Sequence, residues 1–186
     1  MGMRPFEGEV TSRIILAIGL RDCLGADLVQ RDHAFSSLKG TSKEDGVATL
    51  FTQIIEGHLP AHFVWQDSVC VGFLSIAPLK PGHTLVVPKA EVDHWLDLDP
   101  DCVAHLSVVA QKIGKAQMQA YRPVRIGTMV LGLEVPHVHV HVVPIWKPTD
   151  LDFQNAQSNT SQEVLAREAS VLRQALRELG YEEVSD

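Results

Sequence analysis

Short apolar runs separated by turn residues occupy the middle of the chain. Three such runs cover residues 62–66, 69–76 and 83–88, and they are rich in valine, leucine and aromatic residues. Residues of these types in runs of this length are typical of strands, and the short connections predict neighbours that form an antiparallel meander. Two further strands are predicted over residues 124–131 and 137–145.

Apolar positions recur at the spacing of a helix in three other segments. A short helix is predicted over residues 48–55. A long helix is predicted over residues 99–121, because an aspartate and a proline supply its N-cap and its first helical residue. A last helix follows the segment 160–163, which reads as a capping box, and it stops before Gly180. Helices grouped around an antiparallel sheet predict the α+β fold class.

The two ends of the chain differ from this central pattern. Residues 1–46 read as an N-terminal extension of unknown role, in which residues 14–29 have the pattern of a short amphipathic helix and residues 36–46 that of a linker. The main domain is predicted over residues 47–148. Residues 149–186 are expected to form a polar, loop-like linker and a C-terminal helix that packs on the domain.

The composition narrows the classes of function. The 186 residues suit one domain with a full core, and 45% of them are hydrophobic, which is ordinary for a globular protein. Sixteen basic against 23 acidic residues give a net charge of −7, which argues against a nucleic-acid partner. The apolar run over residues 14–20 is far too short to span a membrane. Three cysteines without regular spacing favour reduced thiols and a cytoplasmic location.

The most informative segment is a run in which valines alternate with His137, His139 and His141. In a strand every second side chain points to the same face, so the three imidazoles line one face while the valines pack into the core. A purely structural role is disfavoured, because crowded imidazoles repel one another when protonated. Two chemical interpretations remain: the histidines bind a metal ion, or they carry out nucleophilic and electrostatic catalysis on phosphate.

The surrounding motifs favour the second interpretation. The histidine run resembles the His-x-His-x-His motif of the histidine triad (HIT) family of nucleotide hydrolases and transferases. Residues 49–57 resemble the opening segment of that family, residues 72–78 its central strand, and residues 81–89 its Pro-Gly-His strand. The resemblance extends over roughly residues 47–148, and it is specific because several independent motifs agree.

The resemblance implies a catalytic role for each of four histidines. His139 would be the nucleophile that attacks the α-phosphorus of a nucleotide derivative and forms a nucleotidyl-histidine intermediate. His137 would orient the ring of His139 through its other nitrogen, while His141 and His83 would donate hydrogen bonds to phosphate oxygens. The resemblance also implies a homodimer with a nucleotide substrate and no cofactor.

The resemblance further implies a nucleotide-binding pocket, with two departures from the family pattern. The positions that would form an apolar slot for the base are Phe51, Ile54, Phe73 and Leu85. Ser75 stands where an aspartate often contacts the ribose hydroxyls, so its neutral contact would be weaker. Glu134 places a carboxylate where phosphate contacts are expected, although the segment around it resembles a bacterial branch of the family.

A third departure concerns zinc. Some branches of the family bind zinc with a Cys-x-x-Cys pair and a histidine, at positions that here hold Thr49, Thr52 and Glu91. Hydroxyls and a carboxylate do not replace thiolates and an imidazole at zinc, so no metal is expected. The expected function is therefore that of a nucleotidyl hydrolase or transferase. The alternatives are a non-catalytic nucleotide-binding or regulatory protein that retains the triad, and a metalloprotein that uses the triad as ligands.

Overall fold

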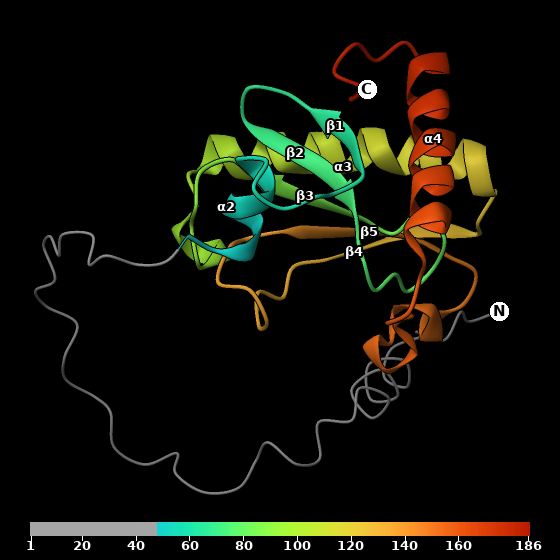
Figure 1. The fold of residues 1–186 in the computed structure, drawn as a ribbon, viewed down its shortest axis with the longest axis horizontal. Coiled ribbons are helices and arrows are strands. Elements are labelled where there is room, and N and C mark those ends of the chain that lie inside the picture. Colours follow the sequence, from blue (N-terminus) through green and yellow to red (C-terminus); the bar gives the residue numbers. More distant parts are fainter. Residues whose placement is uncertain (1–47) are drawn as a thin grey trace, which may run out of the picture. The chain divides into compact units, whose positions relative to one another are not determined.

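The computed structural model describes residues 48–186, and Figure 1 shows them as a sheet with helices on both faces. The five strands are β1 (Phe63–Gln66), β2 (Cys70–Leu74), β3 (Thr84–Pro88), β4 (Arg125–Met129) and β5 (Val140–Ile145). Their spatial order is β1-β2-β3-β5-β4, and all neighbours are antiparallel. The first three strands form the expected meander, whereas β5 lies between β3 and β4.

The helices begin and end close to the predicted residues. They are α2 (Leu50–Ile55), α3 (Pro100–Tyr121) and α4 (Gln162–Glu178). As predicted, α3 begins after Asp99, whose side chain accepts a hydrogen bond from the N–H of Asp101. The end of α4 before Gly180 is also confirmed, since that glycine has a φ of +81°.

Three local predictions are corrected by the structure. The histidine strand begins at Val140 rather than at residue 137, because the ladder with β3 starts at Val140 and the ladder with β4 at His141. The N-cap of α4 is Ser161 rather than Thr160, and its side chain accepts from the N–H of Val164. The segment expected to be a loop contains two 3-10 helices, η2 (Pro148–Leu151) and η3 (Phe153–Asn155).

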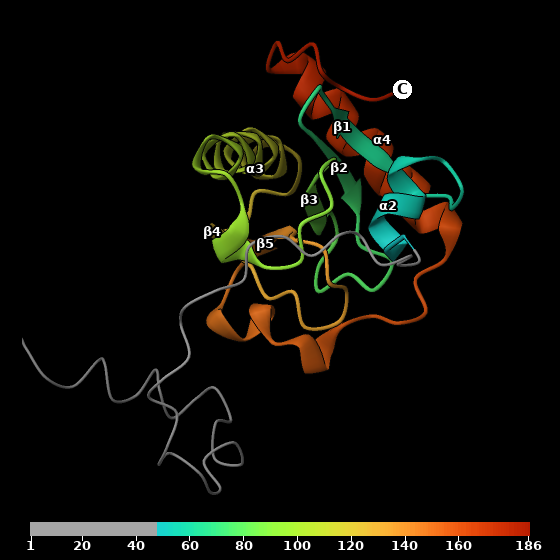
Figure 2. The same cartoon turned by 90° about the vertical axis from the view of Figure 1, so that its left-hand side faces the viewer.

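Side chains on the two faces of the sheet belong to two apolar clusters. One face packs against α3 and α4, with Val64, Val86 and Val142 among its fully buried residues. The other face packs against α2 through Phe51 and Ile54. Figure 2 shows α3 nearly end-on, with α2 across the sheet strands from it. Strands β2 and β3 are therefore buried on both faces, which explains why they are apolar at successive positions.

The sequence predictions for residues 14–29 and 36–46 lie outside the described residues, and the proposed division into an extension, a domain and a C-terminal segment stays a prediction. Among residues 48–186, no helix is both long and apolar enough to cross a membrane.

Candidate active site

The histidine run places its side chains on opposite faces of the sheet, as the alternation predicts. Val138, Val140 and Val142 are buried in the core under α3. The rings of His139 and His141 lie on the other face, with centroids 4.8 Å apart, and Phe51 from α2 packs edge-on against His139 at 4.9 Å. The alternation therefore begins before the strand itself, because His139 precedes the first ladder pair of β5.

The ring of His139 has a defined proton arrangement. Its Nδ1 lies 2.8 Å from the main-chain carbonyl of His137. A carbonyl oxygen only accepts, so Nδ1 carries the hydrogen, and in the neutral ring the lone pair belongs to Nε2. The contact from His137 to this other nitrogen of His139 is thus made by the main-chain carbonyl of His137.

His83 and His141 form a second ordered pair. The N–H of Leu79 donates to Nδ1 of His83 at 3.1 Å, so the neutral His83 ring carries its hydrogen on Nε2. That Nε2 lies 3.0 Å from Nδ1 of His141, which must accept. The remaining hydrogen of neutral His141 is therefore on Nε2. The site thus combines an unprotonated Nε2 on His139 with an Nε2–H donor on His141.

The turn before β3 positions His83. Gly82 has a φ of +79°, and a Cβ at this position would collide with the ring of Tyr121 from α3. The carbonyl of Gly82 accepts a hydrogen bond from the side chain of Gln117 at 2.8 Å, and the same amide group donates to the carbonyl of Val142 at 2.9 Å. Glycine is thus required for both backbone conformation and space at the residue before His83.

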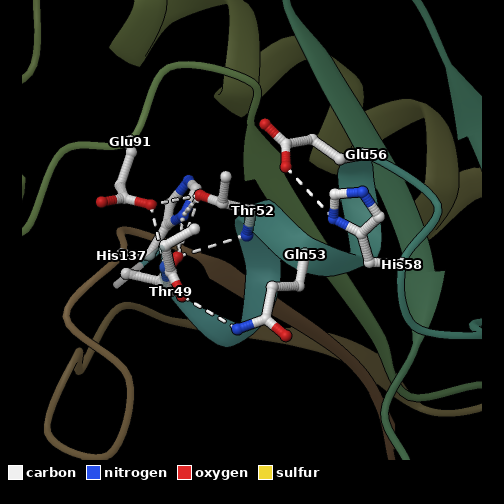
Figure 3. Close-up of polar contacts among 8 residues, drawn as sticks. Thr49, Thr52, Gln53, Glu56, His58, Glu91 and His137 are labelled. Carbon is white, nitrogen blue, oxygen red and sulfur yellow. Dashed lines mark hydrogen bonds and ion pairs between the residues drawn. The ribbon is translucent and has the colours of Figure 1, made fainter. Parts of the chain in front are cut away.

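His137 is held on both ring nitrogens. Its Nε2 lies 2.9 Å from the carbonyl of Pro88, at the end of β3, and its Nδ1 lies 2.9 Å from the hydroxyl of Thr49, the N-cap of α2. Because the Pro88 carbonyl can only accept, Nε2 carries the hydrogen and Nδ1 of the neutral ring accepts from Thr49. Figure 3 shows this ring between Thr49, Thr52 and Glu91.

Burial favours the neutral form of all four imidazoles. It lowers the pKa of His83 to about 3 and that of His141 to about 4, and in both rings repulsion from neighbouring imidazoles adds to the effect. Burial also lowers the pKa values of His137 and His139. The negative charge of Glu134 acts in the opposite direction on the pKa of His139. At neutral pH the ring of His139 is therefore neutral, and its Nε2 has a free lone pair.

The structure brings the four predicted base-slot residues together. Phe51, Ile54, Phe73 and Leu85 belong to one apolar cluster on the α2 face of the sheet. The rings of Phe51 and Phe73 lie 5.7 Å apart with an edge-to-face geometry. Leu85 is directly opposite His141 in the ladder between β3 and β5. A buried apolar cluster therefore adjoins the histidines.

The two departures from the family pattern occupy different environments. Ser75 is half-buried at the end of β2; its N–H donates to the carbonyl of His83 at 3.0 Å, and its hydroxyl accepts from the N–H of Ala77 at 3.3 Å. Ser75 thus lies at the His83 end of the site. Glu134 is exposed in the loop before the triad, close enough to His139 for its charge to influence that ring.

Sequence reasoning missed two features of the site. Phe153 from η3 packs edge-on against His141 with centroids 5.2 Å apart. Lys80 forms an ion pair of 2.8 Å with the buried Asp150, which also accepts from the N–H groups of Trp146 and Lys147. This network connects the turn before His83 to the segment after β5. Phe153 and Asp150 lie in a polar stretch without periodicity and Lys80 lies in a turn, so only the Lys and Asp charges offered any signal.

One other side-chain group among the described residues has the composition of a metal site. Asp67, Cys70 and His105 lie close together. Both carboxylate oxygens of Asp67 already accept hydrogen bonds, from the indole of Trp65 and from the N–H groups of Val69 and Cys70, and His105 contacts the same carboxylate. These hydrogen bonds give the cluster a structural role, which is to connect the turn between β1 and β2 to α3.

The fold and the site together define an α+β protein with an imidazole cluster on a central strand. A family model described as the HIT domain matches residues 56–147. An uncharacterised HIT-like protein of Saccharolobus solfataricus is 34% identical over 102 residues, which cover 52% of this chain and 73% of that protein. The chain belongs to the HIT family, and thus to a superfamily of nucleotide-binding hydrolases and transferases.

Solved structures agree with this assignment. A zinc-bound histidine triad family protein from Mycobacterium smegmatis gives a TM-score of 0.61 at 29% identity, covering 70% of this chain and 94% of that one. A hypothetical histidine triad nucleotide-binding protein from Sulfolobus tokodaii gives a TM-score of 0.60 at 26% identity, covering 69% of this chain and 92% of that one. The α+β fold with its antiparallel sheet is that of the family.

Proposed function

We propose that the protein is a hydrolase that cleaves the α-phosphate linkage of a nucleotide derivative through a nucleotidyl intermediate on His139. The substrate is a dinucleoside polyphosphate or a nucleoside phosphoramidate. The observation that carries the proposal is the pair of opposite proton arrangements. Nε2 of His139 offers a lone pair, and Nε2–H of His141 offers a donor, on rings 4.8 Å apart.

The reaction would have two steps. In the first, the lone pair on Nε2 of His139 forms an N–P bond with the α-phosphorus, and the leaving group departs with the electron pair of its own bond to phosphorus. In the second, water forms an O–P bond and releases one proton to the solvent, the N–P bond breaks, and the lone pair returns to Nε2. His141 would donate to a phosphate oxygen as charge develops, with His83 holding its tautomer.

Glu134 has a defined place in this proposal. As the α-phosphorus is attacked, His139 loses electron density and its ring becomes cation-like. The nearby carboxylate stabilises positive charge on that ring, as its effect on the pKa of His139 indicates. Glu134 thus assists the covalent intermediate while it weakens the binding of an anionic substrate.

Trapping of the intermediate tests the proposal. The protein is mixed with nucleoside phosphoramidates and dinucleoside polyphosphates carrying a labelled α-phosphate, quenched within milliseconds to seconds, and analysed by peptide mass spectrometry. We expect the nucleotidyl group on His139. A well-folded protein that binds nucleotides but forms no adduct and no product with any substrate would instead support the non-catalytic alternative, which Ser75 and Glu134 favour.

We also propose that two copies form a homodimer. β4 is an edge strand, and Val124 and Leu131 beside it are half-exposed apolar residues. An apolar hollow lies between α3 and β4, lined by residues that include Gly114, Met118 and Ile126. Exposed edges and apolar hollows of this kind are covered in stable proteins.

Sedimentation at micromolar concentration measures the mass directly. We expect a dimer for the natural sequence and a monomer for Met118→Glu, which places a charge in the hollow. A monomeric natural protein would overturn this part of the proposal.

The free thiols of Cys70 and Cys102 are compatible with the proposed cytoplasmic location.

A further inference from the structure

Three polar side chains converge beside His137, the first histidine of the triad, and the four groups come from three separate segments. Thr49 and Thr52 come from the first turn of α2, Glu91 follows β3, and His137 precedes β5 (Figure 3). The two hydroxyls lie 3.0 Å apart, and the hydroxyl of Thr52 donates to the carboxylate of Glu91. The N–H of Thr49 donates to the same carboxylate oxygen at 3.0 Å.

This donor set does not fit a zinc ion. A structural zinc site needs four ligands that are thiolates, imidazoles or carboxylates, whereas here two of the four groups are neutral hydroxyls. The groups also satisfy one another. Nδ1 of His137 accepts from Thr49, and Thr52 donates to Glu91, so no lone pair of the imidazole is left for a metal.

The hydrogen bonds have a single consistent direction when His137 is neutral. Pro88 accepts from Nε2, which leaves Nδ1 to accept the hydroxyl hydrogen of Thr49. The hydroxyl oxygen of Thr49 also accepts from the N–H of Thr52, as the N-cap of α2. Thr49 thus needs both functions of a hydroxyl, donor to the imidazole and acceptor from the helix.

The cluster is connected to the nucleophile through the main chain. The carbonyl of His137 accepts from Nδ1 of His139. The main chain there is tied further, since the N–H of Val138 donates to the carbonyl of Val92 at 2.8 Å. Whatever fixes the ring of His137 therefore also fixes the carbonyl that sets the tautomer of His139.

We propose that Thr49, Thr52 and Glu91 act as a metal-free positioning cluster, which holds the neutral Nε2–H tautomer of His137 and thereby the carbonyl that orients His139. The cluster also anchors the start of α2, which carries Phe51 against the His139 ring. The same three positions that hold zinc ligands in other branches thus hold hydrogen-bonding groups with an equivalent mechanical task. The catalytic part of this inference rests on the proposed function, whereas the tautomer of His137 does not.

Nitrogen-15 NMR of the histidine rings tests the tautomer without any substrate. Thr49→Asp keeps an acceptor for the helix but removes the donor, so Nδ1 of His137 must carry a hydrogen to contact the new carboxylate. We expect a singly protonated His137 ring at pH 7 in the natural protein and in Thr49→Ser, and a doubly protonated ring in Thr49→Asp. The control Thr160→Val loses a hydroxyl bond to the Gln157 carbonyl, far from the triad in sequence, and should leave the His137 signals unchanged.

An unchanged His137 spectrum in a folded Thr49→Asp protein would overturn the proposal, because it would mean that Thr49 merely caps the helix. Turnover is measured on the same variants. We expect kcat to fall roughly tenfold in Thr49→Asp with little change in KM, and to recover in Thr49→Ser, since loss of a group that orients a reactive ring costs about one decade or more. A shifted spectrum without any turnover in the natural protein would contradict the proposed function alone.

Metal content provides an independent test. The natural protein is incubated with zinc and then dialysed against zinc-free buffer. It should retain far less than one zinc per chain. The triple variant with Thr49→Cys, Thr52→Cys and Glu91→His should bind about one zinc, or one Co²⁺ with the absorption of a tetrahedral thiolate site, because His137 supplies the fourth ligand. About one tightly held zinc in the natural protein would overturn the proposal. A folded triple variant without metal would show that the four positions do not converge as described.

Discussion

The two ends of the triad are held in different ways. At one end, His137 contacts hydroxyls, a carbonyl and, through Thr52, the exposed carboxylate of Glu91. At the other end, the ring of His141 hydrogen-bonds to a second imidazole, His83, whose own partner is a main-chain N–H. Both ends fix a tautomer, but only the His137 end contains a carboxylate, that of Glu91, which would stabilise a protonated imidazole.

This difference has an electrostatic consequence. Burial lowers the pKa of His137, whereas the hydrogen bond to the Pro88 carbonyl and the negative charge of Glu91 act in the opposite direction. At the other end burial and imidazole repulsion act together, and the pKa values fall to about 3 for His83 and about 4 for His141. The His83–His141 end is therefore the one that acid should disrupt first.

The largest expected effect comes from removal of the ring that both ends serve. His139→Ala should reduce turnover by about 10³-fold or more, because no nucleophile remains, while the fold is kept since Val138 and Val140 still fill the core. Steady-state kinetics and circular dichroism measure the two properties. His58→Ala, which changes an exposed histidine paired with Glu56, is the matched control and should retain activity. Near-normal hydrolysis by folded His139→Ala would exclude the assigned nucleophile.

Acid should destabilise the protein mainly through the imidazole end. His83 and His141 have folded-state pKa values below their ordinary value of 6.5, so the unfolded chain binds more protons below pH 6.5. The stability is fully present above pH 6.5 and is lost as the pH falls from 6.5 toward about 4, by up to about 1.4 kcal/mol per pH unit for each ring. Urea unfolding between pH 7.5 and 4.5 measures this slope.

The variant His83→Gln isolates that contribution. Because the amide oxygen of glutamine does not coincide with Nδ1 of the imidazole, disruption of the hydrogen bond from the buried N–H of Leu79 should cost about 1–3 kcal/mol at pH 7.5. The decline in stability below pH 6.5 should nevertheless be shallower than in the natural protein, since one titrating ring is gone. An identical slope in both proteins would mean that the His83–His141 pair does not control acid sensitivity.

Ser75→Asp should tighten nucleotide binding at the His83–His141 end. A carboxylate accepts from both ribose hydroxyls, whereas the hydroxyl of Ser75 already accepts from the N–H of Ala77. Hydrogen bonds to charged groups contribute about 1.5–3 kcal/mol against about 1 kcal/mol for neutral pairs, so affinity for ribonucleoside monophosphates should rise roughly tenfold. Calorimetry with ribo and 2′-deoxy ligands measures the gain, which should shrink for the deoxy series. Equal gains for both series would place Ser75 away from the sugar.

The smallest effect is expected from Glu91→Gln at the other end. The amide can still accept from Thr49 and Thr52, so we expect turnover to fall only about twofold to fivefold, in line with the loss of one charge-assisted hydrogen bond at an exposed site. The hydrogen bonds of Thr49 and Thr52 keep the pKa of Glu91 below its ordinary value, so the natural protein should keep this contact down to pH 4.5. A loss as large as that of His139→Ala would assign Glu91 a direct part in the chemistry.

The sequence alone determined most of the secondary structure and the separation of the valines from the histidines of the candidate site. Local signals were sufficient for α3, where an aspartate and a proline define the start, and for the alternation that separates Val138 and Val140 from the histidines. These signals act between residues a few positions apart, so they survive without knowledge of the fold. The family motifs then added His83 and the apolar positions of the base slot.

Tertiary structure decided how the histidines are held. His83 is 58 positions from His141, and Thr49 is 88 positions from His137, so no periodicity could reveal their hydrogen bonds. The sequence predicted that His137 orients His139 through the other ring nitrogen of His139, and the tertiary structure shows that the main-chain carbonyl of His137 makes this contact. Tautomers depend on which nitrogen faces a group that can only donate or only accept, and that is fixed when distant segments pack together.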